Sequence, residues 1–586
     1  MSNIETIQYD AIIVGGGGSG LRAALELSKT GYRVAVVSKV FPTRSHTVAA
    51  QGGINAALGN VHHDDDWRWH MYDTIVGSDF LGDQDAVEFM CQSAPQAVIE
   101  LEHMGLPFSR DPKGKIYQRA FGGQTRNYGG ELASRTCCAA DRTGHAMLHT
   151  LYQQNVASNT TFLNEWFAID FILSDDRHVC GISAIEIETG KLYSIISKAV
   201  VLATGGAGKI FASSTNAASC TGDGVAMVAR AGFGLQDMEM WQFHPTGLYG
   251  VGLLISEGTR GEGGYLINSK GERFMQTYAP LQADLSCRDV VARSSMLEIK
   301  AGRGCGPLKD HVMLKLNHLP AETFEKKLPG ITELAITYLN IDPRKDPLPV
   351  VPTCHYMMGG IPTNRHTEVI DATRGQDRVV KGLYAIGECA CVSVHGANRL
   401  GANSLLDLIV FGKACGLRVS EYLKIQSAPH ANTSNQIHSI RRYNRCQNSS
   451  KGISVAEVRS KLQSIMQEDF GVFRDHKSMA SGLKSLQTLK QDAEHMHLED
   501  KSEVFNTARL ELLECENMIE VAIATAISAF DRKESRGAHS RIDYPERNDE
   551  KWHKHIIVNN HSAISYRNVN MKPLHEKPIL LKSRDH

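Results

Sequence analysis

The feature that most constrains this fold is a run of glycines near the N-terminus, between a short apolar segment and a helical pattern. Tyr9–Val14 (YDAIIV) has the composition of a buried strand, and Gly15–Gly20 (GGGGSG) follows it directly. Helical spacing continues over Leu21–Lys29, and Tyr32–Ser38 predicts a second strand. Strand, G-x-G-x-x-G, helix and strand in this order predict a dinucleotide-binding unit, with a pyrophosphate at the helix N-terminus.

The end of the second strand departs from the NAD-binding pattern. An acid usually ends that strand and binds the adenosine ribose. Here Ser38 and Lys39 stand at that point. The departure weakens an assignment to NAD but is compatible with FAD, so other residues are expected to contact the adenosine.

Two later segments predict further strands of the same nucleotide domain. Lys198–Gly206 (KAVVLATGG) ends in Thr-Gly-Gly, and Gly382–Glu388 (GLYAIGE) ends in Gly-Glu. In two-part FAD domains an acid placed like Glu388 binds the ribitol chain, although a solvated acid at a strand end is the alternative. The nucleotide domain is therefore expected to be discontinuous in sequence.

The chain of 586 residues is too long for one compact core. We expect an α/β fold, with a discontinuous Rossmann-like FAD-binding domain, an inserted α+β capping domain and a C-terminal helical domain. The predicted division is 1–240 and 352–430 for the FAD-binding domain, 241–351 for the capping domain, 440–535 for the helical domain, and 536–586 for a polar tail that packs on the surface. Helical spacing of apolar residues supports the helical domain at 440–535.

Composition excludes several classes of function. The formal net charge is −1, so nucleic acid is not an expected partner. The 13 cysteines include no C-x-x-C pair, so no metal or iron–sulfur site is expected. This cysteine usage predicts that the protein works in a reducing compartment. No apolar run reaches the ~18 residues of a membrane span, and the N-terminus has neither a signal-peptide nor a transit-peptide pattern.

A histidine follows the glycine loop at short range. Arg44–Gly53 (RSHTVAAQGG) is a Gly-flanked segment that places His46 where it can meet the isoalloxazine ring of a bound flavin. An imidazole nitrogen is nucleophilic enough to bond the 8α-methyl carbon of that ring. A loop histidine on the surface is the alternative interpretation.

Five further segments concentrate cationic and hydrogen-bonding side chains: Gln242–Thr246 (QFHPT), Ser256–Gly264 (SEGTRGEGG), Arg288–Arg293 (RDVVAR), Thr353–Gly360 (TCHYMMGG) and His395–Ser404 (HGANRLGANS). Taken singly, each also has a structural interpretation, such as a turn histidine or an arginine that caps a helix. With the flavin-type segments, in this order, the chain resembles the flavoproteins of the succinate dehydrogenase and fumarate reductase family from Tyr9 to about His555.

The resemblance implies a site for succinate or fumarate, which are small dicarboxylates. Residues that match the family's substrate contacts are His244, Ser256, His355 and Arg399, where Ser256 replaces the common threonine but keeps its hydroxyl. The family assigns proton transfer to the arginine that matches Arg288, although chemistry alone favours a histidine as base. Glu257 and Arg260 match a proton relay, and Glu262 is a competing candidate.

The resemblance also implies FAD, bound covalently through the 8α-carbon to His46. The helix that begins near Asn403 is expected to point free N–H groups at the flavin. The residues that match FAD contacts are Gly15, Gly16, Gly17, Gly18, Ser19, Gly20, Ser38, Lys39, Thr43, Arg44, Ser45, His46, Thr47, Gln51, Gly52, Gly53, Asp223, Glu388, Ser404 and Leu405.

Several members of the family are alternatives. Gln51 favours succinate:quinone oxidoreductase over quinol:fumarate reductase, whose members tend to carry Glu there. L-Aspartate oxidase, with noncovalent FAD, is disfavoured by His46, and a non-enzymatic scaffold would lack site residues that are present here. Since electrons must leave the flavin, an iron–sulfur subunit and a quinone-reducing membrane anchor are expected partners. The expected location is the cytoplasmic face of a bacterial inner membrane, or the mitochondrial matrix face if the chain is a processed one.

Overall fold

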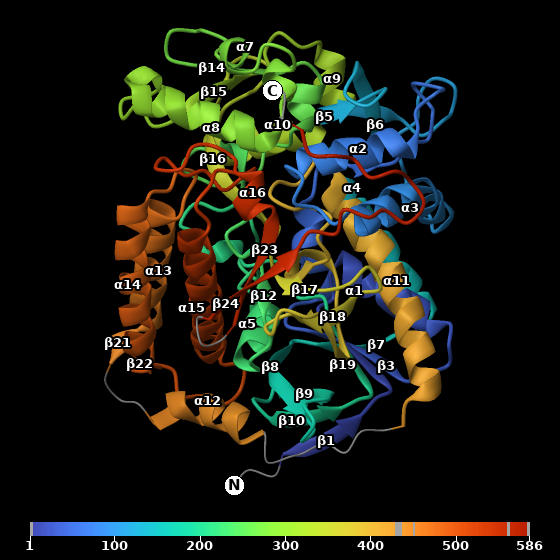
Figure 1. Ribbon diagram of the computed structural model, residues 1–586, viewed down its shortest axis with the longest axis vertical. Helices are drawn as coiled ribbons and strands as arrows, with labels where there is room; N and C mark the ends of the chain where they lie inside the picture. Colours follow the sequence, from blue (N-terminus) through green and yellow to red (C-terminus); the bar gives the residue numbers. More distant parts are fainter. Residues whose placement is uncertain (1–3, 428–435, 449–451, 560–562, 583–586) are drawn as a thin grey trace.

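A six-stranded sheet forms the centre of the nucleotide-binding half of the molecule (Figure 1). The computed structural model describes residues 4–427, 436–448, 452–559 and 563–582. The sheet has the order β18-β19-β11-β2-β3-β7, and its strands are β2 (Ala11–Val14), β3 (Val34–Ser38), β7 (Thr161–Asn164), β11 (Ala199–Leu202), β18 (Glu368–Asp371) and β19 (Arg378–Ala385). All neighbours are parallel except β18 and β19. The sheet therefore joins the early and late segments predicted to share one nucleotide domain.

The register brings the ends of the central strands together. Val14 of β2 pairs with Val37 of β3 and with Leu202 of β11, and Leu202 pairs with Ala385 of β19. Helix α1 (Gly18–Ser28) starts at this edge, after a loop in which Gly15 has φ +116°. A Cβ on Gly15 would lie 2.1 Å from the Ala203 carbonyl oxygen, so only glycine allows the loop to pass so close to β11.

Other layers cover both faces of this sheet. Helices α1, α4 (Thr143–Ala157) and α11 (Asn403–Ile425) pack against one another on one side. A four-stranded sheet of β1 (Glu5–Gln8), β8 (Trp166–Leu173), β9 (Val179–Glu186) and β10 (Leu192–Ile196) packs on the other. The strand predicted over Tyr9–Val14 begins at Ala11 in the structure, because the chain passes at residues 9 and 10 from β1 in this second sheet to β2 in the central sheet.

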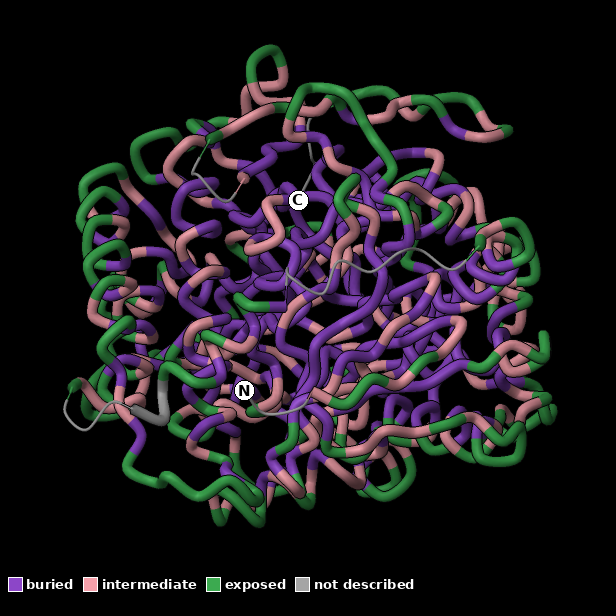
Figure 2. Tube along the Cα trace, turned by 90° about the horizontal axis from the view of Figure 1, so that it is seen from below, coloured by how far each residue is buried: buried purple, intermediate pink, exposed green. Residues whose placement is uncertain are grey.

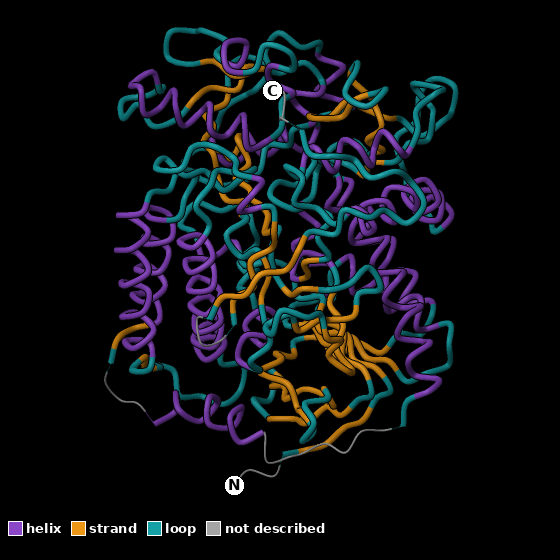
Figure 3. Tube along the Cα trace, viewed as in Figure 1, coloured by secondary structure: helices purple, strands orange, loops and turns teal. Residues whose placement is uncertain are grey.

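The segment between β12 (Leu235–Gln236) and β17 (Ile361–Pro362) forms a separate lobe, at the top of Figure 3. Its sheet has the order β13-β16-β15-β14, formed by Trp241–Leu248, Leu348–Met357, Val312–Lys315 and Tyr265–Ile267. Helix α8 (Arg288–Glu298) packs on β13 and β16. The lobe has a hydrophobic cluster of its own, which includes Leu248, Val291, Leu314 and Val350.

Three long helices follow the predicted helical region: α13 (Val455–Asp469), α14 (His476–Ala493) and α15 (Thr507–Asp531). All three starts are capped by side chains: Ser454 on α13, Asp475 on α14 and Asn506 on α15. Helix α15 packs against α5 (Asp223–Arg230) and shares a core with the nucleotide half. Figure 2 shows the outer sides of the helices exposed and the contact side buried. The boundary predicted near residue 430 lies outside the described residues.

The tail after α15 is more deeply buried than its polar sequence predicts. It contributes α16 (Asp549–Trp552), β23 (Lys554–Val558) and β24 (Ile564–Asn568), and β23 joins β12 in a three-stranded sheet. The arginines Arg532, Arg536 and Arg541 are each 0–1% exposed. Ion pairs compensate the burial of these charges, so the first part of the tail packs closely against its neighbours.

His555 of β23 anchors the tail to the nucleotide half. Its Nδ1 lies 2.6 Å from Asp237 and its Nε2 lies 3.2 Å from Asp83, and the ring is fully buried. Burial opposes the charge, but the two carboxylates raise the pKa of His555 to about 9. The charged imidazole therefore stabilises the fold, fully below pH 6.5, and this contribution is lost as the pH rises through 9.

We expect His555→Gln to lower the free energy of unfolding by roughly 3 kcal/mol at pH 6. The difference between variant and wild type should shrink as the pH approaches 10, because the native imidazole then loses its charge. Denaturant unfolding across this pH range measures the difference. The exposed His575 gives the control His575→Gln. A pH-independent difference for His555→Gln would contradict a charged native imidazole.

Candidate active site

One large cavity runs from the glycine loop at the edge of the sheet to the inserted lobe. Most of the site residues predicted from sequence line it: Gly15, Gly16, Gly17, Gly18, Ser19, Ser38, Lys39, Ser45, His46, Thr47, Gln51, Gly52, Gly53, Asp223, His244, Ser256, Arg288, His355, Glu388, Arg399, Ser404 and Leu405. Gly20, Thr43, Arg44, Glu257 and Arg260 are not among its lining residues. The structure thus brings the predicted cofactor and substrate residues into one continuous space.

The backbone at one end of the cavity suits a pyrophosphate and a flavin. Nothing lies within 4 Å of a Cβ built on Gly205, and the nearest atom to one on Gly17 is 3.6 Å away. The N-termini of α1 and α11 both meet this space, with Ser404 and Leu405 in the first turn of α11. Free N–H groups at helix starts bind anions, so the residues present fit FAD.

Ala402 precedes α11 in a left-handed conformation, with φ +63°. This conformation costs a non-glycine residue about 1 kcal/mol or more. The neighbouring contact of Asn55, whose Nδ2 donates to the Gly401 carbonyl over 2.7 Å, holds the turn in place. The start of α11 is therefore fixed beside the cavity at some cost in backbone strain.

Asp223, held by Lys39, supplies the acid that is missing from the end of β3. Lys39 Nζ lies 2.7 Å from Asp223 Oδ2 and 2.6 Å from Glu514 Oε1 of α15. Burial opposes the charge on Asp223, but the ion pair with Lys39 keeps its pKa below the usual value. An acid from the start of α5 thus stands beside the end of the second strand, where the sequence has lysine.

Glu388 lies in the middle of the cavity wall. It is buried, and its Oε1 accepts a hydrogen bond from the Met357 amide at 3.1 Å. Burial raises the pKa of this carboxyl to about 7. Near neutral pH it can therefore act either as a donor or as an acceptor to a polyol chain.

His46 lies on a short 3₁₀ turn (His46–Ala49) at the cavity wall. Its Nδ1 accepts from the Ala217 amide at 3.3 Å, and its Nε2 is 3.3 Å from Asn216 Nδ2. Burial and the charge of Lys209 lower the pKa of His46 to about 4. The ring is therefore neutral at physiological pH and keeps a nucleophilic nitrogen.

Two arginines from different parts of the chain meet on one acceptor. Arg288 Nη1 and Arg399 Nη2 both donate to Gln242 Oε1, over 3.1 and 3.2 Å. Arg399 also lies 4.4 Å from the centre of the Tyr356 ring, and its Nε has no protein partner. Burial and the charge of Arg288 lower the pKa of Arg399 to about 9, so the Arg399 guanidinium remains charged at neutral pH.

Neutral histidines complete this cationic end of the cavity. Burial and the charge of Arg288 lower the pKa values of His244 and His355 well below the usual value. The Nδ1 of His244 accepts from the Thr246 amide at 3.3 Å, which places its proton on Nε2, and Nε2 has no protein partner. His355 Nδ1 is bonded to Thr215 at 2.8 Å. His244 therefore presents an unused N–H donor to a ligand.

The hydroxyl and amide groups opposite these rings are also fixed. Ser256 Oγ accepts from the Gly258 amide at 3.1 Å and keeps its own proton free to donate. Gln51 joins the two halves of the site, because its Nε2 donates to the Leu254 carbonyl at 3.1 Å and its Oε1 accepts from the Ser256 amide at 3.0 Å.

A carboxylate stands directly behind Arg288. Glu257 Oε2 accepts from Arg288 Nε at 2.7 Å, and Arg260 Nη2 lies 3.9 Å from the same Glu257 oxygen. Burial opposes the charge on Glu257, but the two arginines hold its pKa below the usual value. The competing candidate Glu262 instead bonds Lys327 and Tyr117. The predicted relay residues thus form a row with Arg288, and Glu262 is not part of it.

Sequence reasoning assigned no role to several residues of the site. Gln242 lies two residues before His244 on one strand, so both side chains lie on the same face, and this spacing is the signal that could have found it. Asn216 and Tyr356 gave no local signal. Asp289, next to Arg288 in sequence, pairs with Arg293 over 3.1 Å.

Comparison with known proteins agrees with this geometry. The FAD binding domain family matches residues 10–405, and the fumarate reductase flavoprotein C-terminal family matches residues 459–585. A succinate dehydrogenase flavoprotein subunit of Coxiella burnetii is 56% identical, with all of both chains covered. The mitochondrial succinate dehydrogenase flavoprotein subunit of Oryza sativa is 52% identical. That alignment covers 97% of this chain and 91% of the Oryza sativa chain.

Solved structures are similar over the same extent. A quinol fumarate reductase of E. coli has a TM-score of 0.91 at 37% identity, with 97% of this chain and 98% of that chain covered. A quinol–fumarate reductase with bound menaquinol has a TM-score of 0.90 at 38% identity, covering 97% and 100%. Among the described residues, no helix of this chain is long and apolar enough to cross a membrane.

Proposed function

Because this chain belongs to the family of succinate dehydrogenase and fumarate reductase flavoproteins and is an FAD-dependent oxidoreductase, we propose that it oxidises succinate to fumarate. The observation that carries the substrate is the meeting of Arg288 and Arg399 at one end of the flavin cavity, beside the unused Nε2–H of His244. Glu257 balances one of these two buried charges, so a bound anion can balance the other, and two separated sets of donors suit a dicarboxylate.

The roles of the binding residues follow from their donors. Arg399 has an unpaired Nε–H and binds one carboxylate together with His355. His244 and Ser256 donate to the other carboxylate from β13 and the loop before α6 (Gly258–Gly261). FAD, when bound, supplies the acceptor for the hydride that leaves succinate.

Proton transfer is assigned to Arg288, with Glu257 and Arg260 behind it. A guanidinium is already protonated and has no acceptor, but this one donates from Nε to the Glu257 carboxylate over 2.7 Å. Arg288 can therefore take a proton from substrate as it gives its Nε proton to Glu257, so that the arginine keeps a single charge. Arg260 stabilises the carboxylate from the far side, at 3.9 Å.

The FAD contacts are assigned by their place along the cavity. The glycine loop and the start of α1 bind the pyrophosphate, Asp223 and Lys39 face the adenosine, and Glu388 faces the ribitol chain. His46 carries the covalent bond to the 8α-carbon. Its low pKa supports this assignment, because a neutral imidazole nitrogen is the nucleophile that the bond requires.

The direction of the reaction is assigned from Gln51, because the family resemblance implies that Gln at this position favours a succinate:quinone oxidoreductase. The Gln51 amide donates to the Leu254 carbonyl and accepts from the Ser256 amide, and an ionised Glu could only accept. Quinol:fumarate reductase is the alternative, because the groups that donate hydrogen bonds to the substrate carboxylates would bind succinate and fumarate alike.

The partners and the division into domains are proposed on the same basis. Relatives at 37–38% identity are named as quinol fumarate reductases, so we assign to this chain an iron–sulfur partner and a quinone-reactive membrane anchor, at the inner membrane surface. The separate sheet and hydrophobic cluster of the lobe support residues 241–351 as a capping domain. The packed α13–α15 helices support residues 440–535 as a helical domain.

We expect Arg399→Ala to lower kcat/KM for succinate by two to three orders of magnitude, since a bidentate carboxylate contact contributes roughly 2–4 kcal/mol. FAD should stay bound, because Arg399 faces the substrate end of the cavity. Succinate-dependent reduction of an artificial electron acceptor gives the rate, and flavin absorbance gives the cofactor content. Near-normal kinetics would remove Arg399 from the site.

Arg288→Lys should lose most of kcat in both directions while it still binds dicarboxylate. Lysine keeps the charge, but its shorter side chain cannot contact Glu257 and Gln242 at once. Rates with succinate and with fumarate, together with an inhibition constant for malonate, test this. A variant with wild-type kcat would assign proton transfer to another group, such as His244.

His46→Ser should keep FAD but lose most succinate oxidation. An imidazole on the 8α-carbon withdraws electrons and raises the flavin potential, which favours oxidation of a weak reductant such as succinate. The variant should retain much of its fumarate reduction with a low-potential donor. Acid precipitation should leave flavin in the wild-type pellet and release it from the variant. Release from the wild type would contradict the covalent bond.

A further inference from the structure

The C-terminal tail touches both halves of the substrate site at one point. The Gly537 amide donates to Asp79 Oδ2 over 2.8 Å, and its carbonyl accepts from Arg293 Nη1 over 2.6 Å. The next amide, of Ala538, donates to the Ala397 carbonyl over 2.8 Å. Residues 537–538, here called the tail junction, therefore contact the lobe and the nucleotide half together.

Each contact is close in sequence to a substrate-binding arginine. Arg293 lies on α8, five residues after Arg288. Ala397 precedes Arg399 by two residues, and its own amide donates to the Ser78 carbonyl over 2.9 Å. The tail junction thus ties the helix of one arginine to the backbone segment of the other.

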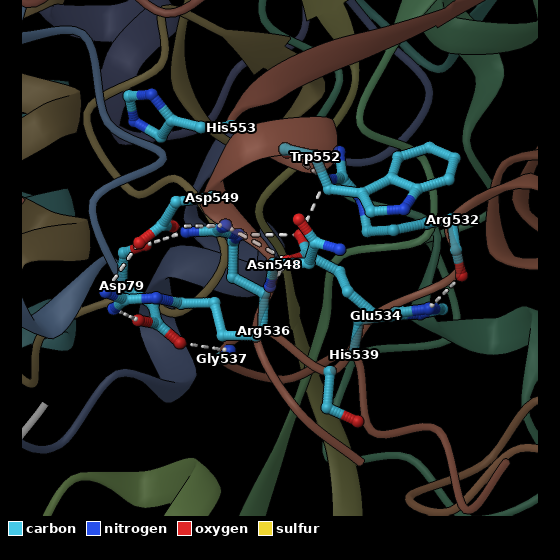
Figure 4. Close-up of polar contacts among 12 residues, drawn as sticks. Asp79, Arg532, Glu534, Arg536, Gly537, His539, Asn548, Asp549, Trp552 and His553 are labelled. Atoms are coloured by element: carbon cyan, nitrogen blue, oxygen red, sulfur yellow. Dashed lines mark hydrogen bonds and ion pairs between the residues drawn. The ribbon is translucent and has the colours of Figure 1, made fainter. Parts of the chain in front are cut away.

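The tail junction is rigidly mounted by buried ion pairs (Figure 4). Arg536 bonds both oxygens of Glu534, at 2.7 and 3.0 Å, and Asp549 at 2.7 Å. Arg532 bonds Glu534 from the other side at 3.1 Å. The side chains of Arg532, Glu534 and Arg536 are 0% exposed. A compact set of paired charges of this kind fixes the local backbone in one arrangement.

The backbone at residue 537 accepts only glycine. Its φ is +54°, and a Cβ there would lie 2.5 Å from the Ala397 carbonyl oxygen. A side chain at this position would push directly on the segment that carries Arg399. The requirement for glycine comes from the close approach of the tail to the site, not from the ion pairs.

We propose that Arg293 and Gly537 form a latch that holds the lobe closed over the substrate and sets the distance between Arg288 and Arg399. The proposal rests on the proposed function, since it gives these two residues a positioning role for the same dicarboxylate. The Arg293–Gly537 bond joins the lobe to a part of the chain outside it. It can therefore form only when the lobe is placed as in this structure.

The kinetic consequence separates this role from a merely structural one. If substrate binds the closed form, loss of the latch lowers the fraction of closed protein and raises KM by the same factor. Saturating substrate restores closure, so kcat should change little. General damage to the fold would instead lower the amount of active protein and leave KM unchanged.

Three variants test the latch. Arg293→Met keeps the aliphatic length without a donor, and we expect KM for succinate and the dissociation constant of malonate both to rise about tenfold, with kcat within about twofold. Arg293→Lys keeps a donor and should recover part of the affinity. Arg344→Met is the matched control, since this half-exposed arginine of the same lobe bonds the neighbouring Asp342, at 2.8 and 3.0 Å.

Proteolysis gives a readout that does not depend on turnover. Malonate should protect the lobe of the wild type from trypsin, and Arg293→Met should need correspondingly more malonate for the same protection. Gly537→Ala should show the same rise in KM, and Arg293→Met covers the case in which that variant does not fold. An unchanged KM and malonate affinity in Arg293→Met overturns the latch alone. A wild type that neither oxidises succinate nor binds malonate overturns the proposed function instead.

Discussion

The site depends on a buried acceptor that two arginines share. Gln242 Oε1 accepts from Arg288 and from Arg399, while Gln242 Nε2 donates to the Arg399 carbonyl and to Asn398. The amide is neutral, so it orders the two cations without cancelling their charge. Glu257 supplies a counter-charge beside Arg288, and Glu388 also attracts Arg399. The two guanidinium groups repel one another, and this repulsion favours the binding of an anion between them.

The rest of the molecule can be understood as the support for this arrangement. The parallel sheet ends at the glycine loop and fixes where FAD can lie. The lobe brings Arg288, and the backbone that follows β20 (Ala390–Cys391) brings Arg399. Helix α15 reaches the opposite end of the cavity, where Glu514 bonds Lys39 and Asn517 Nδ2 donates to Asp223 over 2.8 Å. The tail then joins these parts through buried ion pairs. These pairs fix the position of the tail against the two halves and contribute less to the overall stability.

Sequence predicted the local units of this fold and missed the long-range polar ones. The strand–glycine–helix order near Gly15 is decided by neighbours in sequence, so α1 and its flanking strands could be predicted to within a few residues. The pairing of Lys39 with Asp223 joins residues 184 positions apart, and the contacts of His555 span 318 and 472 positions. Buried polar side chains also leave no periodic pattern in the sequence. Glu257 and Arg260 could be placed in a relay only through the family resemblance, because a charge in a Gly-rich loop also suits solvent.

The central claim is that two separate sets of donors hold the two ends of one dicarboxylate. Its most direct test is the equilibrium dissociation constant of the FAD-loaded wild-type protein for malonate and for propionate, measured from changes in flavin absorbance. A monocarboxylate leaves one set of buried donors unpaired, so propionate should bind at least about 100-fold more weakly than malonate. Equal affinity for the two acids would contradict the account, because a single carboxylate would then satisfy the site.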